Sequence, residues 1–324
     1  MSGLEQAKAI IQKWQTTIKE RIICSQINLD LISVCLLSRG HLLLEDVPGL
    51  GKTTLAKSIA QSLALQFKRV QCTPDLLPSD ITGITVFDPA TQSFKFLPGP
   101  IFTQILLADE INRTSPRTQS ALLEAMAERS VTVDRKTHSL SKSFMVIATQ
   151  NPVEFSGTYP LPEAQLDRFL MRLSLGYPSK SDEAKILAMH VNTENPDDLK
   201  PVMEEKTLVS LQAMATKIKI EKNLQDYALS LAEATRTHTK IRLGVSPRAV
   251  IALLRAAQSM AMINARGYVT AQDIQLLIKP IWAHRMIIRS AQDSVEKILD
   301  EILQAKQVPA MPDAASGKTS LELI

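Results

Sequence analysis

Residues 42–54 read LLLEDVPGLGKTT, an apolar run that leads into a loop containing Gly49 and then into Gly51-Lys52-Thr53. A strand, a glycine-containing loop and a helix in this order form a phosphate loop, in which backbone amides and the start of the helix hold phosphate groups. The expected phosphate-binding positions are Val47, Pro48, Gly49, Leu50, Gly51, Lys52, Thr53 and Thr54. The stretch therefore predicts a binding site for a nucleoside triphosphate.

One position of this loop departs from the usual pattern. Lys52 should reach the β- and γ-phosphates, and the Thr53 hydroxyl should ligate magnesium. Asp46 occupies the place of the first glycine. Because Asp tolerates left-handed backbone angles better than most residues, the turn is still feasible. A carboxylate beside phosphates is unfavourable, so we expect the Asp46 side chain to point outward.

A second Gly-Lys-Thr, at residues 317–319, does not qualify. Pro312 holds its first-glycine position, and no apolar strand precedes it. It lies in a polar stretch at the end of the sequence, so the strand-loop-helix context is missing.

Residues 105–108 form a continuous apolar run that suits a strand buried on both faces, and Asp109 and Glu110 follow it. At the end of such a strand, the Walker B position, we expect Asp109 to hold the magnesium shell and Glu110 to orient and deprotonate the attacking water. The alternative is a pair of solvated acids with no ligand. The distance from the phosphate loop fits one intervening helix and strand, which favours the catalytic interpretation.

Residues 144–149 are the next apolar run, and Gln150, Asn151 and Pro152 follow it. The amide of Asn151 is expected to bond the γ-phosphate or the attacking water, and Pro152 would end the strand. An Asn-Pro turn without a ligand is the alternative. The phosphate-binding interpretation of Asn151 is favoured over this turn because three successive apolar strands end in residues that suit phosphate chemistry.

Two arginines are further candidates. Arg168 follows a short predicted helix and precedes the apolar residues 170–175, so it should lie at the surface; in a ring it could act as an arginine finger on the neighbouring subunit's nucleotide. Arg248 lies in the first turn of a helix with Ser246 as N-cap and Pro247 as first residue. A cation there opposes the helix dipole, so a nearby anion is expected.

Together these strings resemble the MoxR family of AAA+ ATPases over nearly the whole chain. The strings are residues 45–54, 107–113, 118–126, 148–152 and 161–169. The resemblance implies an ATP- and Mg²⁺-dependent hydrolase that forms a ring, usually hexameric, with a hairpin inserted in helix 2. It also implies chaperone-like maturation or metal-cofactor assembly of client complexes, and partners with a von Willebrand factor A domain. Arg168 matches the family's arginine finger, and Arg248 matches its second sensor on the lid.

Composition is consistent with this assignment. The chain has 324 residues, a net charge of +4 and only 4% aromatic residues, so neither nucleic-acid nor membrane binding is expected. Three cysteines without paired metal spacing indicate reduced thiols. No signal peptide or membrane-spanning apolar run is evident, so we expect a soluble, cytoplasmic protein.

Periodicity predicts an α/β fold, a P-loop NTPase αβα core with a mostly parallel sheet and inserted β-hairpins, followed by an all-α lid. The predicted organisation is an N-terminal helix packing on the core (1–25), an AAA+ nucleotide-binding core (26–177), a helical lid (178–305) and a disordered tail (306–324). Within the lid, Ser179 and Asp182 should cap one helix, and Thr270 and Asp273 should cap another that ends before Pro280.

Two strand-turn-strand patterns interrupt the core, at residues 84–97 and 129–140. The expected turns are 89–92 and 134–137. In the family that the chain resembles, such hairpins face the ring channel or a partner. Packing of both hairpins on the core is the alternative.

Three other functions remain open at this level: a nucleic-acid motor, a nucleotide-gated scaffold with little turnover, and a magnesium-chelatase motor subunit. DNA-stimulated ATPase activity, absence of phosphate release, and a requirement for the chain in porphyrin metallation would support them in that order.

Overall fold

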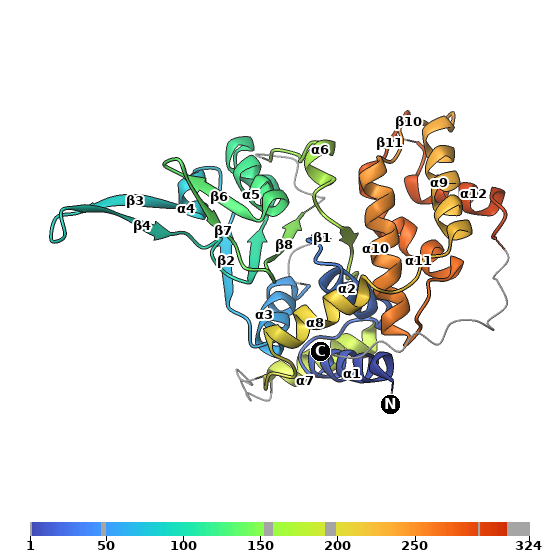
Figure 1. The fold of residues 1–324 in the computed structure, drawn as a ribbon, viewed down its shortest axis with the longest axis horizontal. Coiled ribbons are helices and arrows are strands. Elements are labelled where there is room, and N and C mark those ends of the chain that lie inside the picture. The colour runs from blue at the N-terminus through green and yellow to red at the C-terminus, as the bar shows by residue number, and fades with distance from the viewer. Residues whose placement is uncertain (1, 47–49, 152–157, 192–198, 291, 310–324) are drawn as a thin grey trace.

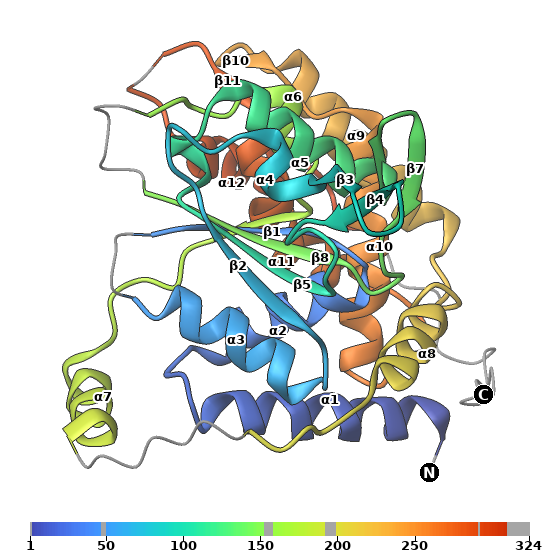
Figure 2. The same cartoon turned by 90° about the vertical axis from the view of Figure 1, so that its left-hand side faces the viewer.

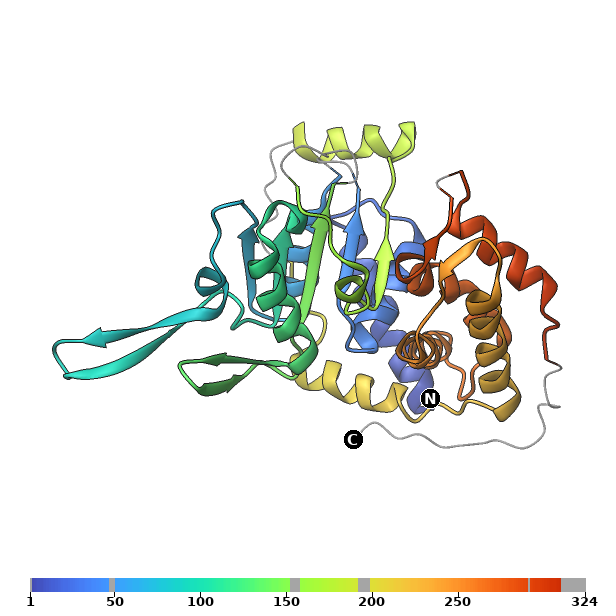
Figure 3. The ribbon, with the colours of Figure 1, turned by 90° about the horizontal axis from the view of Figure 1, so that it is seen from above.

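A five-stranded parallel sheet forms the centre of the computed structural model, which describes residues 2–46, 50–151, 158–191, 199–290 and 292–309 (Figure 1). Its strand order is β2-β5-β8-β1-β9, and all four neighbouring pairs are parallel. The strands are β1 (Leu42–Glu45), β2 (Phe67–Gln71), β5 (Ile105–Asp109), β8 (Met145–Gln150) and β9 (Met171–Leu173). Because the strands are parallel, their carboxyl ends share one edge of the sheet, which is visible side-on in Figure 3.

Helices cover both faces of this sheet (Figure 2). They are α1 (Gly3–Lys19), α2 (Gln26–Leu37) and α3 (Lys52–Ser62) on one face, and α4 (Pro78–Thr82) and α5 (Pro116–Glu128) on the other. Alternate residues of a strand point to opposite faces. Leu42 and Leu44 accordingly join the core under α1 to α3, whereas Leu43 joins the core under α5. The predicted α/β class with a parallel sheet is confirmed.

The N-terminal helix packs on the core, as its periodicity predicts. Leu4, Ala7, Ile11, Trp14 and Ile18 are buried in one row of α1. The indole Nε1 of Trp14 donates to the Ser62 hydroxyl at 2.8 Å, so the helix is fixed to α3.

Two antiparallel hairpins project from the core, and β3–β4 extends farthest from the sheet (Figures 1 and 3). They are β3 (Gly83–Asp88) with β4 (Ser93–Pro98), and β6 (Ser130–Val133) with β7 (Lys136–Ser139). The turn predicted at 134–137 is shorter than expected. Only Asp134 and Arg135 form it, both with positive φ, because a two-residue turn of this kind matches the strand twist.

Helices dominate the chain after β9. They are α7 (Lys180–Val191), α8 (Glu205–Ala215), α9 (Lys222–Thr237), α10 (Pro247–Ile263), α11 (Ala271–Trp282) and α12 (Val295–Ala305). A short ribbon, β10 (Ile241–Leu243) with β11 (Ile287–Ile288), joins the predominantly helical lid. The predicted caps are present: Ser179 and Thr270 hydroxyls accept from the backbone amides of Asp182 and Asp273. Residues 310–324 of the predicted tail lie outside the described chain.

The prediction that α11 ends before Pro280 is wrong, because the helix continues to Trp282. Proline removes one backbone hydrogen bond and leaves the Leu276 carbonyl without its donor. Leu276 is exposed, so that carbonyl can be hydrated, while Leu277, Ile281 and Trp282 are buried. Trp282 also donates to the Ala249 carbonyl at 3.1 Å. Packing therefore outweighs the local cost of proline.

Within the described part of the chain, no helix combines the length and apolar character required to cross a bilayer. The three cysteines are free thiols; Cys35 and Cys72 are buried and Cys24 is partly buried.

Candidate nucleotide-binding site

The described part of the phosphate loop has the geometry that an anion requires. Gly51 has φ of 76° and caps α3, and an added Cβ at this position would meet no atom within 4 Å. The left-handed angle favours glycine, and the open space lets a ligand approach the backbone. Val47, Pro48 and Gly49 lie outside the described residues. Leu50 and Gly51 thus lead directly into the positive end of α3.

Lys52 is buried at the start of α3, and its Nζ donates to the Asp46 carbonyl at 2.7 Å. Burial lowers the pKa of Lys52, and the charges of Asp46, Asp109 and Glu110 oppose that shift. The lysine therefore lies within electrostatic range of both acids at the end of β5. Thr53 is partly buried and Thr54 exposed in the same first turn.

The Asp46 side chain does not point outward, contrary to the prediction. It is only 5% exposed, and its carboxylate accepts from the Ser174 hydroxyl at 2.6 Å and from the amides of Leu175 and Gly176 at 2.7 and 3.2 Å. These donors follow β9, the neighbour of β1. Three hydrogen bonds compensate the burial of the charge, so Asp46 ties the loop to the end of β9.

Asp109 ends β5 and has a partner on each carboxylate oxygen. Oδ1 accepts from the Thr149 hydroxyl at 2.6 Å, and Oδ2 accepts from Arg69 of β2 at 2.6 Å. Both partners come from strands that flank β5. The carboxylate is held in place, and its oxygens belong to the hard donor class that Mg²⁺ prefers.

Glu110 has a left-handed backbone, with φ of 57°, which is uncommon for a residue with a side chain. Its amide donates to the Thr149 hydroxyl at 2.8 Å. Its carboxylate accepts from Gln71 Nε2 at 2.9 Å and lies 3.3 Å from the Arg113 guanidinium. Thr149 therefore bonds the carboxylate of Asp109 and the backbone amide of Glu110, and Gln71 fixes the orientation of the Glu110 side chain.

Asn151 directly follows β8 and is buried. Because β8 lies between β5 and β1, its carboxyl end is beside both Asp109 and the start of the phosphate loop. The structure thus brings Lys52, Asp109, Glu110 and Asn151 to one edge of the sheet, as predicted. Pro152 lies outside the described residues.

The described contacts of Arg168 and Arg248 are with residues of α5 and of the lid, not with these four site residues. Arg168 donates to the Leu123 carbonyl of α5 at 2.8 Å. Arg248 is exposed in the first turn of α10, and its charge acts on Arg285. Arg285 lies 3.1 Å from the carboxylate of Asp167, the residue before Arg168. The segment with Arg168 therefore contacts the lid, and the roles of both predicted arginines stay predictions.

Arg285 is a buried cation that sequence reasoning missed. It lies in the 3₁₀ turn η2 (Ala283–Arg285) and donates to the Phe169 carbonyl at 2.6 Å. The pKa of Arg285 is lowered to about 10; burial is the main cause, the carboxylate of Asp167 opposes the shift, and the charge of Arg248 contributes to it. The neighbouring His284 ring contacts the same carbonyl at 3.2 Å. The lid is thus bonded to the core beside Arg168.

Arg69, Gln71 and Thr149 were also missed as members of the site. Arg69 and Gln71 are alternate residues of β2, a position that places both side chains on one face toward the end of β5. The available signal was the pair of polar residues at alternate positions, 69 and 71, in the edge strand beside the Walker B strand.

The residues present fit a nucleotide with magnesium. The open space at Gly51, the buried Lys52 ammonium and the oxygens of Thr53 and Asp109 are complementary to phosphate groups and to a hard cation. Among the described residues, no group of three or more His, Cys, Asp or Glu side chains forms a metal site of its own.

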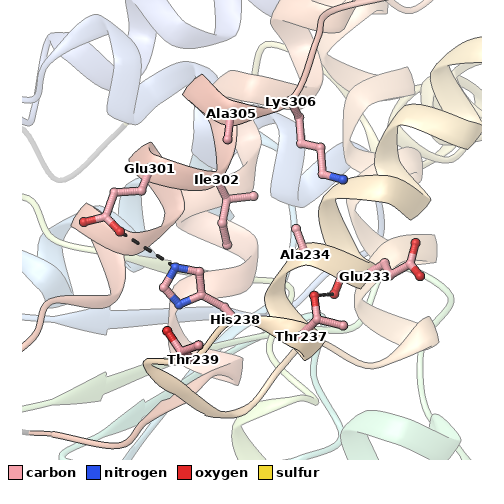
Figure 4. A pocket seen from close by; sticks show the side chains of 9 residues that line it. All are labelled: Glu233, Ala234, Thr237, His238, Thr239, Glu301, Ile302, Ala305 and Lys306. Carbon is pink, nitrogen blue, oxygen red and sulfur yellow. Dashed lines mark hydrogen bonds and ion pairs between the residues drawn. The ribbon is translucent and has the colours of Figure 1, made fainter.

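A separate pocket of about 670 Å³ lies in the lid between α9 and α12 (Figure 4). His238 lies 3.8 Å from Glu301 across it, and Lys240 lies 3.3 Å from the same carboxylate. It contains none of the predicted site residues.

Comparison with known proteins identifies two family models in the chain. The ATPase family associated with various cellular activities (AAA) matches residues 41–171, and the AAA lid domain matches residues 233–304. These segments include the phosphate loop, both acids, Asn151, Arg168 and Arg248.

Several similar proteins span almost the same length. An uncharacterised protein of Bacillus subtilis, YeaC, is 46% identical over 91% of this chain and 93% of its own length. Chaperone MoxR1 of Mycobacterium tuberculosis is 37% identical, covering 95% and 85%. Protein MoxR of Paracoccus denitrificans is 31% identical, covering 88% of each chain. A crystal structure of a candidate ATPase from Cytophaga hutchinsonii superposes with a TM-score of 0.88 at 33% identity, covering 95% and 97%.

Proposed function

We propose, from the premise that this chain belongs to the MoxR family of AAA+ ATPases, that it hydrolyses ATP in a ring of identical subunits, usually a hexamer in this family, to mature client protein complexes. The family has nucleotide hydrolysis as its general activity, and Chaperone MoxR1 is a relative that covers most of the chain.

One observation carries the hydrolase proposal: Thr149 bonds both Asp109 and Glu110 at the edge where Lys52 begins α3. Bound magnesium would neutralise charge on the β- and γ-phosphates. Lys52 is placed to hold those phosphates, and the oxygens of Thr53 and Asp109 suit the metal shell. Phosphate and metal binding therefore converge on the acids of β5.

Glu110 is the residue assigned to accept the proton of the attacking water. Its carboxylate is partly exposed, so a water molecule can reach it, and its peptide unit is fixed by Thr149. The present bond to Gln71 turns the carboxylate toward β2. We therefore assign the active orientation to a state in which that bond is broken. Asn151 would orient the same water or the γ-phosphate.

Ring assembly explains the separate position of Arg168. It lies with Asp167 and Arg285 at the lid contact rather than beside Lys52, Asp109 and Glu110. A guanidinium that completes a neighbour's site stabilises the charge of the transition state. Arg248, exposed close to this segment, would couple lid position to nucleotide.

The β3–β4 hairpin is the surface that we assign to clients or partners. Phe87 and Phe94 pack edge to face at 5.5 Å, and they are 54% and 75% exposed. Exposed aromatic clusters on a projecting element are typical of protein-binding surfaces. Proteins with a von Willebrand factor A domain are the partner class that we propose from the family.

The decisive experiment compares phosphate release by the parent chain and by Glu110→Gln. The variant keeps the size and one acceptor of Glu110 but is a poor base, so turnover should fall at least 100-fold while ATP still binds. Equal turnover would contradict the assignment of the base. ATP binding with no turnover in the parent would instead indicate a nucleotide-gated scaffold.

The action of Arg168 in a neighbouring site is tested with mixed rings. Arg168→Ala should lose turnover and keep nucleotide affinity, whereas rings of Lys52→Ala should lose turnover because their own phosphate site is weakened. Mixing the two variants places an intact arginine beside an intact phosphate site at some interfaces, so part of the activity should return. No recovery in assembled mixed rings would refute action between subunits.

A further inference from the structure

A cavity of about 960 Å³ lies at the opposite edge of the sheet from the nucleotide site. Its wall comes from the end of α2, the junction of α5 and β6, the segment between β7 and β8, and the helices α8 and α10. The lining segments before β1 and β8 lie at the amino ends of these strands, whereas the phosphate loop follows the carboxyl end of β1. The cavity is therefore about 15 to 20 Å from the phosphate loop, the length of a strand.

The lining of this cavity carries positive charge without a carboxylate. Arg39, Arg129, Lys142 and Arg255 line it, and no Asp or Glu does. None of the four forms an ion pair with an acid in the part of the chain that the structure describes. The acid that approaches from α8 is Glu205, which accepts from the Ser141 hydroxyl at 3.0 Å and from Ser143 and Gln104 as well. Three neutral donors hold this carboxylate, and among the described residues it forms no ion pair with any of the four cations.

Arg129 and Arg39 are held together by neutral acceptors only. Arg129 donates to the carbonyls of Arg39 and Lys142 at 2.8 and 2.9 Å, and Arg39 Nε donates to the Gln212 side chain at 3.0 Å. The pKa of Arg129 is lowered, first by burial and then by the charge of Arg39. The two guanidinium groups thus repel each other across the cavity wall, and an anion between them would relieve that repulsion.

The remaining two cations face the same space from different elements. Lys142 belongs to the segment before β8, and Arg255 belongs to α10 of the lid. Both are exposed and can reorient. Ser38 of the core and Ser259 of the lid are hydrogen-bonded at 2.8 Å in the wall, so core and lid meet there.

We propose that this cavity binds a small molecule with two or more phosphate groups, at a site distinct from that of ATP hydrolysis. Its volume is that of a small-molecule site, and it is lined by five separate segments of the chain. Guanidinium groups bind phosphate in a bidentate manner, and a ligand with several phosphates can contact cations that are several ångströms apart. Because the wall includes α10 and the base of the β6–β7 hairpin, such a ligand would bridge core, lid and hairpin.

The test is calorimetric titration with tripolyphosphate, carried out in the Lys52→Ala background to weaken binding at the phosphate loop. One binding event is expected. Adding Lys142→Gln and Arg255→Gln should weaken it at least tenfold, since two charge-assisted contacts are lost. The matched control adds Lys13→Gln and Lys297→Gln, which remove the same charge from exposed positions outside the cavity. That control should change the affinity less than twofold.

A second measurement does not depend on substitutions in the cavity. Tripolyphosphate should protect Arg255 from modification by phenylglyoxal in the Lys52→Ala chain, as read by peptide mass spectrometry. Lack of binding, equal weakening by both pairs of substitutions, or unprotected Arg255 would overturn the proposal. Equally tight competition by hexaglutamate would also overturn it, because the cavity would then recognise an acidic peptide rather than phosphate groups.

Discussion

Acidification should destabilise the fold through His41, a buried imidazole at the start of β1. Its Nδ1 accepts from the Val146 amide at 2.9 Å, and its Nε2 donates to the Met126 carbonyl at 3.2 Å. The pKa of His41 is lowered from 6.5 to about 4, first by burial and then by the charge of Arg129, against the bond to the Met126 carbonyl, which raises it. Protonation would replace the Nδ1 acceptor by a donor that faces the Val146 donor.

The direction of this change in stability follows from proton binding in the folded and unfolded states. The unfolded chain takes up a proton at His41 near pH 6.5, whereas the folded chain does so only near pH 4. The stabilising effect of the neutral ring is therefore complete above pH 6.5 and is lost as the pH falls toward 4. Between pH 7.5 and 4.5 this linkage should cost roughly 2 to 3 kcal/mol of unfolding free energy.

Urea unfolding at pH 7.5 and 4.5, followed by the fluorescence of the buried Trp14 and Trp282, measures this loss. The control is His41→Gln, whose amide offers a donor and an acceptor but does not titrate. His284 is also buried, with a pKa well below its usual range, but it is present in both proteins and cancels in the comparison. Equal loss of stability in parent and variant between the two pH values would refute the reasoning.

Two further predictions concern the site. Gln71→Ala removes the hydrogen bond that holds the Glu110 carboxylate toward β2, so basal phosphate release should rise two- to fivefold. This increase corresponds to about 0.5 to 1 kcal/mol, the free energy of an exposed hydrogen bond. Unchanged or slower release would show that the bond does not restrain Glu110. Asp46→Gly restores the usual first glycine of the phosphate loop but removes the acceptor for three donors after β9. The free energy of unfolding, measured by urea titration, should therefore fall by about 3 kcal/mol. A more stable variant would contradict the conclusion that Asp46 fixes the loop to the end of β9.

Strand ends and helix faces were predictable because their signals are local. The periodicity of residues 1–25 predicted a helix that packs on the core, and the apolar runs before Asp109 and Asn151 predicted that these residues meet at one edge. Parallel pairing converts such local patterns into a shared site without further information.

The errors arise where distant residues decide the outcome. Asp46 is turned inward by donors that lie about 130 positions later in the chain. The helix continues through Pro280 because Trp282 packs and bonds to α10. Arg69 and Gln71 became site residues only when strand order placed β2 beside β5. Each of these pairings joins residues that are far apart in the sequence, so a local pattern can mark a residue but not its partner.

The bonds of η2 to the segment that precedes β9 have a mechanical consequence. Asp167, Arg168 and Phe169 are consecutive; the first and third are bonded to Arg285, and the middle one donates to the Leu123 carbonyl. Any rotation of the lid that carries Arg285 therefore pulls on both flanks of Arg168. In a closed ring this linkage would transmit the conformation of one protomer to the catalytic centre of the next, which favours turnover that proceeds around the ring in sequence over simultaneous firing.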